Sequence, residues 1–473
     1  MDSSEEYHNA NVEVVENDTN SNKRSSDSGD TKGIFSTNLF FQTEENLMNS
    51  DEKISFLGIS SDSQISIIIN IICSAIGGSC FNFPFIIEKL GLPLTLIIFI
   101  LVMISIFYTI DLLRRFIIDT RYFSFALMTE KIIGSHWMKL YVICSLILYL
   151  SIEINYISEI FTIVSKLIGI SGKEDYIKII VYFILTILFE VFICSYSSNI
   201  KKIHIISFFS IIFFLVILIS VIVLGFINLT NEIEKLSYEN LIATDTDNNL
   251  DLFFFINSYS IVYIYGYSYH SSFPTLLGNF QNNLDEKNSR NVQIISFIII
   301  GISYLLITFF GYLVKSDVPE ILFINDDSIE NNVFETIFKI IICLFEFSVI
   351  SLRFIVIRDN YTTLFGKKNM TFIKDLIITF IILLFCNIAA YFTNENEIGF
   401  NILSNFMQLF GGIFGVIICY ALPVIIYIGA NGRRKVKSII GYIITGIFLF
   451  VGIASVCHSV YGIFHRNDYL NKL

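Results

Sequence analysis

The sequence predicts an all-α membrane protein with about eleven transmembrane helices, and three observations support that prediction. The 473 residues are 54% hydrophobic and only 15% charged. Apolar runs of about 20 residues recur from residue 64 onward, and Lys and Arg gather in every second loop between them. A bilayer holds no water for the backbone, so such runs form helices that satisfy their own peptide groups.

The first 63 residues have a different composition. They contain 13 acidic residues against 4 basic ones and so hold −9 of the formal net charge of −11. Their high Ser, Asn, Asp and Glu content predicts a disordered acidic tail over residues 1–63. We expect a transmembrane domain at 64–463 and a short C-terminal tail at 464–473. Because the rest of the chain is near neutral, the acidity says nothing about a ligand.

Charges and turn residues delimit the expected spans. The first two spans are joined so closely, at Leu90-Gly91, that they must form a hairpin. The tenth is long enough to tilt or kink, and Pro423 supplies a cause. The charged amphipathic segment 115–139 is expected along the inner membrane face. The spans are 65–89, 91–113, 141–165, 177–196, 203–227, 252–276, 292–314, 334–357, 371–392, 399–429 and 437–462.

The loops predict the orientation. Basic residues follow the even-numbered spans, as in Arg114-Arg115, Lys201-Lys202 and Arg433-Arg434-Lys435, whereas the opposite loops are poor in Lys and Arg. Positive loops stay cytoplasmic, which places the N-terminal tail in the cytoplasm.

Two spans are interrupted at corresponding places. The first reads Gly77-Gly78-Ser79-Cys80 at its middle, with Pro84 seven residues after Gly77. The sixth reads Tyr265-Gly266-Tyr267-Ser268-Tyr269-His270, with Pro274 eight residues after Gly266. Paired discontinuous helices in oppositely oriented halves indicate a transporter with its site at the midplane. The alternative is that the glycines only permit close helix packing.

The chemistry of such breaks explains the interpretation. Unwound backbone leaves amides and carbonyls without helical partners, and half-helix N-termini carry partial positive charge, so both ends of a zwitterion can be bound. The expected substrate-binding residues are those of the two interruptions: Gly77, Gly78, Ser79, Cys80, Tyr265, Gly266, Tyr267, Ser268 and His270. The tyrosines cannot all face a cavity, and His270 is either a titrating group or a hydrogen-bonded residue that fixes the sixth helix.

The run from Gly77 to Leu92 is similar to the "GAGILALPYAFKKLGL" signature of the amino acid/auxin permease family, which includes sodium-coupled and vesicular neutral amino acid transporters. It keeps Gly77, Pro84 and Lys89-Leu-Gly-Leu92, whereas Ser79 replaces a usual glycine. The segment Tyr267 to Pro274 resembles the end of the family's sixth helix. The resemblance covers residues 64–462.

The resemblance implies a leucine-transporter-like fold of five plus five inverted helices with broken helices one and six. It implies a secondary active transporter of amino acids, working by alternating access as a monomer among membrane lipids, without nucleic acid or cofactor. The plasma membrane and a vacuolar or lysosome-like membrane both remain open. The loops contain no phosphate-binding loop, nucleophile elbow or paired catalytic His and Cys, so we expect no enzyme. The eight cysteines lie inside apolar runs and are expected to be packing residues.

The coupling ion is expected to be H⁺, with Na⁺ as the alternative. In sodium-coupled relatives an asparagine stands four residues before the first glycine of the signature, whereas here Cys73 is a poor ligand for a hard cation. Asn70, Ser348 and Ser351 are the residues that would build a sodium site instead.

Buried carboxyl groups are the natural proton carriers. Glu153, flanked one turn each way by Tyr149 and Tyr156, is the candidate coupling or gating group, and the alternative is a carboxyl group paired within the bundle. Glu159 and Glu190 lie nearer span ends and are expected to be structural. Glu346 and Arg353 share a helical face and form either a buried link to neighbouring helices or part of the transport chemistry.

A second interpretation keeps the fold but makes the protein an amino-acid sensor that signals through its tail. In that interpretation the apolar segment 31–41 of the tail docks a partner, whereas the favoured alternative is an inert or turnover-regulating tail. Uptake separates the two, because a sensor binds without flux.

Overall fold

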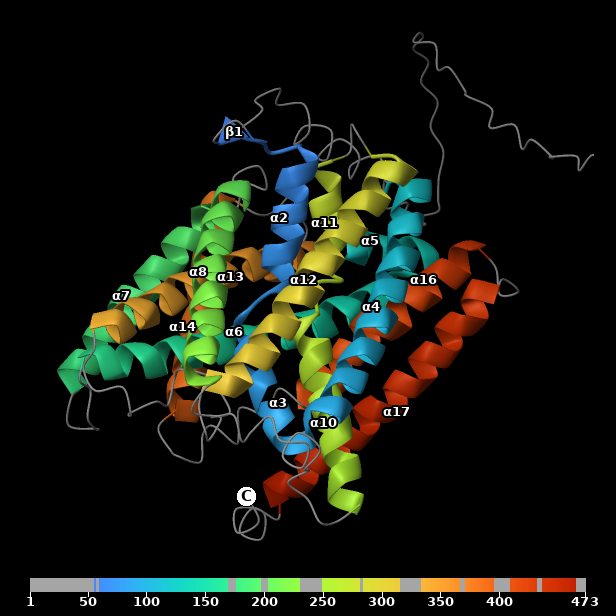
Figure 1. The fold of residues 1–473 in the computed structure, drawn as a ribbon. Coiled ribbons are helices and arrows are strands. Elements are labelled where there is room, and N and C mark those ends of the chain that lie inside the picture. Colours follow the sequence, from blue (N-terminus) through green and yellow to red (C-terminus); the bar gives the residue numbers. More distant parts are fainter. Residues whose placement is uncertain are drawn as a thin grey trace, which may run out of the picture. The chain divides into compact units, whose positions relative to one another are not determined.

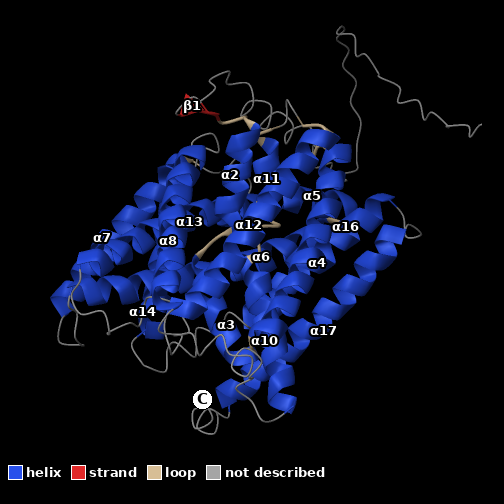
Figure 2. Cartoon of the chain, viewed as in Figure 1, coloured by secondary structure: helices blue, strands red, loops and turns tan. Residues whose placement is uncertain are grey.

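The computed structural model places a helix at each expected span (Figure 1), and helices make up nearly all of the described chain (Figure 2). The described residues are 55–56, 59–168, 176–196, 203–229, 249–280, 284–314, 333–365, 371–394, 409–431 and 436–464. Within them, eight single helices are long and apolar enough to cross a membrane, or nine with one bent pair. Two shorter apolar helices, Ile179–Ser195 and Leu252–Gly266, occupy the fourth and sixth expected spans. The predicted all-α membrane fold is confirmed.

The unbroken helices follow in chain order. They are α4 (Leu92–Thr120), α5 (Phe125–Ile132), α6 (Ser135–Ile168), α7 (Tyr176–Tyr196), α8 (Ile203–Leu229), α12 (Glu286–Val314), α13 (Val333–Phe365), α14 (Phe372–Asn394) and α17 (Val436–Phe464). In the most apolar 18-residue stretch of α13, 72% is buried inside the bundle, whereas the corresponding share in α14 is 22%. The interior of the bundle is therefore built around α13 and α6, which pack on each other, and α14 exposes its apolar side chains.

The first span is broken into two helices. α2 (Gln64–Ala75) and the continuous stretch of η1 (Gly78–Asn82) and α3 (Phe83–Leu90) meet at 54°. The sixth span is also in two parts, α10 (Asn249–Gly266) and α11 (Phe273–Gly278). Pro84 and Pro274 lie in the first turns of α3 and α11, where a missing N–H has no helical partner to lose. Each proline therefore begins a half-helix.

Two segments differ from their sequence predictions. The expected tail ends earlier than residue 63, because β1 (Ser55–Phe56) pairs antiparallel with β2 (Ile59–Ser60) and Ser63 caps α2. The remainder of the predicted tail and residues 465–473 lie outside the described residues. The segment 115–139 does not lie flat as one interfacial piece. Its first residues extend α4 to Thr120, α5 packs on α6 and α16, and α6 begins at Ser135.

The tenth span contains π-helical turns before its proline. η6 (Gly411–Gly415) and η7 (Ile417–Ala421) precede α16 (Leu422–Asn431), whose second residue is Pro423. Proline donates no hydrogen bond and crowds the carbonyl four residues back, so wider turns relieve the helix there. The break from α-helix therefore falls where the sequence predicts a cause for a kink.

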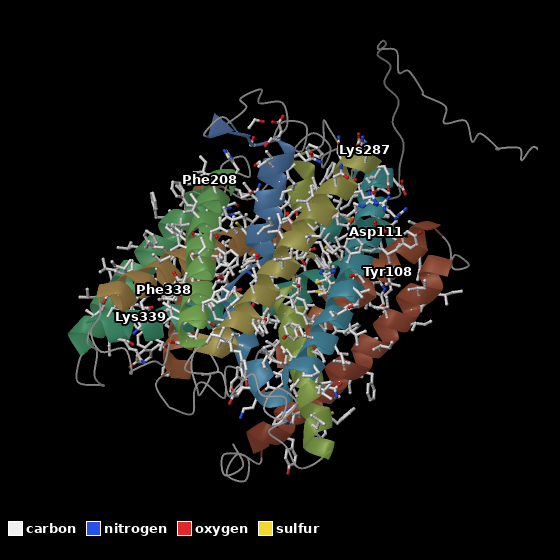
Figure 3. All side chains as sticks on the ribbon, in the orientation of Figure 1. Tyr108, Asp111, Phe208, Lys287, Phe338 and Lys339 are labelled. Atoms are coloured by element: carbon white, nitrogen blue, oxygen red, sulfur yellow. The ribbon has the colours of Figure 1, made fainter. Side chains whose placement is uncertain are left out.

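Arg114 belongs to an ion network inside the bundle rather than to a loop. Its guanidinium is fully buried and pairs with Asp111 at 2.7 Å and with Glu286 at 3.1 Å. It also donates to Gln293 at 2.9 Å. Asp111 and Lys287, the residue after Glu286 in the chain, are labelled in Figure 3, on α4 and α12. The network joins these two helices at the end of α4 where the basic loop was expected.

One tyrosine of α12 joins the two broken spans. The hydroxyl of Tyr304 lies 2.9 Å from the carbonyl oxygen of Ala75 and 2.9 Å from that of Gly266. Ala75 is the last residue of α2, and Gly266 is the last residue of α10. Carbonyls at helix C-termini have no helical donor, and a buried one needs another partner. The one hydroxyl proton of Tyr304 is shared between the two carbonyls, and the Ala75 carbonyl has a second donor in Arg353.

We predict that Tyr304→Phe lowers thermal stability without removing the protein from the membrane. Ala75 keeps a second donor in Arg353, but the Gly266 carbonyl loses its hydroxyl partner. Loss of one buried partner costs about 1–3 kcal/mol. The measurement is the melting temperature of the purified protein in detergent, with Tyr442→Phe on α17 as the control because Tyr442 is half exposed. An unchanged melting temperature for Tyr304→Phe contradicts the bridging role.

Candidate functional site

The break in the first span lies against α6. Gly77 is extended, at φ −150° and ψ −176°, between the end of α2 and the start of η1. A Cβ on Gly77 would overlap the Tyr156 hydroxyl, and one on Gly78 would overlap Oε2 of Glu159. Both positions therefore require glycine because side chains of α6 approach the backbone, and not because the backbone is strained.

The break in the sixth span meets the first at Ser79. A Cβ on Gly266 would lie 2.8 Å from Cζ of Phe83 and 3.4 Å from Oγ of Ser79. Ser79 is fully buried, and its Oγ has no hydrogen-bond partner in the described chain. Cys80 is buried in the same turn, within electrostatic reach of Glu159 and Glu346. The structure thus brings five of the predicted substrate-binding residues into one place.

Arg353 of α13 points into this place, although the sequence did not single it out for substrate binding. Its side chain is 2% exposed, and Nη2 donates to the Ala75 carbonyl at 3.3 Å. The guanidinium carbon lies 5.3 Å from the centre of the Tyr156 ring, a cation–π contact. Nε and Nη1 have no hydrogen-bond partner among the described residues, and neither has the Tyr156 hydroxyl. A buried cation that lacks a carboxylate partner typically costs about 3–5 kcal/mol.

Two carboxyl groups meet beside Gly78. Glu159 of α6 and Glu346 of α13 are fully or almost fully buried and lie within electrostatic reach of each other. Asn155 donates to Oε1 of Glu159 at 2.8 Å. Two carboxyl groups buried this close together cannot both be ionised at low cost, so the pair is suited to hold one proton. Glu159, expected to be structural, instead borders the break.

Glu153 is buried near the same arginine but on another side of α6. It is fully buried, and neither carboxyl oxygen has a hydrogen-bond partner in the described part of the protein. Arg353 and Glu190 act on it through space, and Glu153 in turn acts on Cys194 and Cys386. Glu190 itself accepts from Asn387 of α14 at 2.7 Å. Glu153 is therefore electrostatically linked to the break while it faces α7 and α14.

The remaining predicted residues of the sixth span divide between the break and its surroundings. The Tyr265 hydroxyl is buried within electrostatic reach of Tyr156 and Arg353. The Tyr267 ring packs on Tyr304 with centroids 4.8 Å apart. The carbonyl of Ser268 accepts from Tyr149 at 3.0 Å. These contacts place Tyr265 toward the arginine and give Tyr267 and Ser268 packing and backbone roles.

His270 faces α4. Its Nε2 lies 2.9 Å from Oγ1 of Thr109, and its Nδ1 has no partner in the described chain. This hydrogen bond fixes the turn between α10 and α11, as one of the two sequence interpretations expected.

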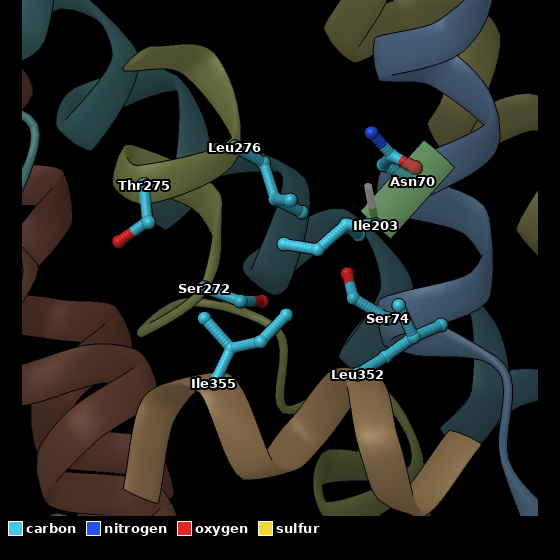
Figure 4. Close-up of a pocket in the computed structure, with 8 residues that line it drawn as sticks. All are labelled: Asn70, Ser74, Ile203, Ser272, Thr275, Leu276, Leu352 and Ile355. Carbon is cyan, nitrogen blue, oxygen red and sulfur yellow. The ribbon is translucent and has the colours of Figure 1, made fainter. Parts of the chain in front are cut away.

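The predicted ion-coupling residues do not form one cluster. Asn70 lines a hollow with Ser74, Ser272 and Thr275, between α2, α8, α13 and α11 (Figure 4). The three hydroxyls each donate to a main-chain carbonyl. The lining includes neither Ser348 nor Ser351, whose hydroxyls donate to carbonyls of α13 at 2.8 Å and 2.7 Å.

Cys73, the residue at the place of the relatives' asparagine, lies close to the hollow. Its Sγ lies 3.1 Å from the Ser207 carbonyl of α8, in a small apolar cluster with Leu352. Leu352 also lines the hollow. The thiol therefore forms a contact between α2 and α8.

The sequence matches a known family of membrane transporters. The family described as transmembrane amino acid transporter protein matches residues 60–465. No curated protein matches the chain. The matched region contains both breaks, Tyr304, Arg353 and the buried carboxyl groups. The chain belongs to the transmembrane amino acid transporter family: it is a multi-pass membrane protein that carries amino acids and not an enzyme.

Proposed function

We propose that the protein moves amino acids by alternating access through a site between the two broken spans. One observation carries the proposal: both breaks end on carbonyls that share the Tyr304 hydroxyl, beside buried polar atoms that have no hydrogen-bond partner among the described residues. Such unpaired groups are costly in a membrane unless a ligand or water binds them. Gly77 and Gly78 leave no Cβ between these groups and the backbone.

The proposed coupling ion is the proton. Three buried carboxyl groups, Glu153, Glu159 and Glu346, lie near the break, and most of their oxygens lack hydrogen-bond partners among the described residues. A sodium site needs several oxygen ligands around one point. The oxygens of Asn70, Ser348 and Ser351 are divided between a hollow and the backbone of α13.

The sensor alternative depends on the tail segment 31–41, which lies outside the described residues. The cytoplasmic N-terminus, the monomeric state and the identity of the membrane stay predictions. Transport and sensing share the same binding site, so measurement of flux separates them.

We expect purified protein in liposomes to accumulate amino acids from a labelled mixture when the proton gradient is directed inward, with the more acidic solution outside. Replacement of sodium with choline should leave the initial rate nearly unchanged, whereas collapse of the pH gradient with a protonophore should abolish accumulation. Protein-free liposomes are the control.

Two outcomes contradict parts of this proposal. Saturable binding without flux would support the sensor interpretation instead. A large loss of rate in choline would mean that Asn70, Ser348 or Ser351 contributes to a sodium site in another state of the protein.

A second prediction concerns Glu153. If it carries the coupled proton, Glu153→Gln abolishes accumulation against a gradient but retains exchange of internal for external amino acid, because exchange needs no net return of the proton. Glu153→Asp is the matched control and should retain part of the accumulation. If the Gln protein still concentrates amino acids with an unshifted pH profile, Glu153 is not the carrier, and Glu346→Gln tests the Glu159–Glu346 pair.

A further inference from the structure

Among the described residues two arginines, Arg114 and Arg353, are completely or almost completely buried, and they differ in their hydrogen-bond partners. Arg114 has two carboxylate partners and several neutral acceptors. Arg353 donates only to the Ala75 carbonyl, and no ion pair joins it to a carboxylate of the described residues. The guanidinium of Arg114 therefore has hydrogen-bond acceptors within the bundle, whereas most N–H donors of Arg353 have none among the described residues.

The geometry of the unpaired N–H donors of Arg353 suits a carboxylate. A guanidinium carries five N–H donors in one plane, and its edges match the two oxygens of a carboxylate. Nη2 has two hydrogens, of which the Ala75 carbonyl takes one. At least one edge therefore keeps both donors, formed by the second Nη2 hydrogen with Nε or with Nη1. Tyr156, whose ring lies against the guanidinium, adds an unpaired hydroxyl beside Gly77.

We propose that Arg353 binds the carboxylate of the transported amino acid, with the Tyr156 hydroxyl as a second donor. The proposal rests on the proposed function and names the group that orients the substrate. Glu153 acts on Arg353 through space, but it forms neither a hydrogen bond nor an ion pair with it. The cation is therefore left with donors for an external anion, and a carboxylate is the anion that amino acids share.

The carboxylate has two possible sources. If it is the α-carboxylate, every transported amino acid uses Arg353. If it is a side-chain carboxylate, only acidic amino acids do so. The two are separated by amides that block one group at a time: leucinamide lacks the α-carboxylate, glutamine lacks the side-chain carboxylate, and isoglutamine lacks the α-carboxylate of glutamate.

The test measures competition in proteoliposomes for uptake of labelled L-leucine, L-lysine and L-glutamate. The apparent affinity of wild-type protein for each amino acid that it carries should exceed that for the blocked analogue by at least about tenfold, because the analogue cannot form the charge-assisted hydrogen bonds of a carboxylate. In Arg353→Gln this ratio should fall to near one. Arg353→Lys should give an intermediate ratio, because lysine keeps the charge but not the planar edge. Arg115→Gln is the control, since Arg115 is partly exposed and paired with Asp111.

A ratio of affinities does not depend on how much protein folds. If Arg353 only stabilises the bundle, its variants lower the melting temperature and the maximal rate but leave the ratio at its wild-type value, which overturns the proposal. Should Arg353→Gln not fold, an Arg353→Lys protein with wild-type affinities for acid and amide also overturns it, as does a wild-type protein that does not discriminate. If wild-type protein carries no amino acid from the mixed pool, the proposed function itself fails.

Discussion

The structure depends on one constraint: every peptide group within a bilayer needs a hydrogen-bond partner from the protein. A continuous helix meets this constraint by itself, and a broken one does not. Here two breaks come together, and the Tyr304 hydroxyl lies 2.9 Å from the last carbonyl of each. The Tyr304 ring also packs on Phe83 of α3, with ring centroids 5.0 Å apart, so this residue links α12 to both halves of the first span. The geometry of the site follows from how these breaks are satisfied.

The second determinant is charge. Arg353 is the buried cation at the break, and Glu153, Glu159 and Glu346 are the carboxyl groups near it. If a substrate carboxylate binds Arg353, it competes with the through-space attraction between Arg353 and Glu153. Proton uptake by Glu153 would then restore the charge balance. Substrate and proton binding are coupled in this account because both act on the same guanidinium.

The sequence predicted the fold and the location of the breaks because both leave local signals. Long apolar runs mark the spans, and the glycine clusters with Pro84 and Pro274 mark the two interruptions. It also predicted that the two interruptions form one site, and the structure places Gly266 beside Ser79. These residues belong to the breaks themselves, so their position along the chain was sufficient.

The partners of the breaks could not be predicted in the same way. Tyr304 and Tyr156 are two of 24 tyrosines, and no spacing separates them from packing residues. Glu159 was placed near a span end because the sequence limited the third span to 141–165, whereas α6 runs from Ser135 to Ile168. Arg353 did leave a signal, a lone cation within an apolar run, but its acceptor at Ala75 is 278 positions away in the chain. Such pairings depend on helix packing.

The central claim is that the substrate binds where the two breaks meet, and Cys80 lies in the first break. It is fully buried beside Ser79, and it can be kept as the single cysteine of a variant in which the other seven are replaced. The measurement is the rate of alkylation of Cys80 by N-ethylmaleimide in proteoliposomes, with a transported and a non-transported amino acid at equal concentration. The account predicts that only the transported amino acid slows the reaction. Equal rates with both, in a variant that still transports, would contradict it.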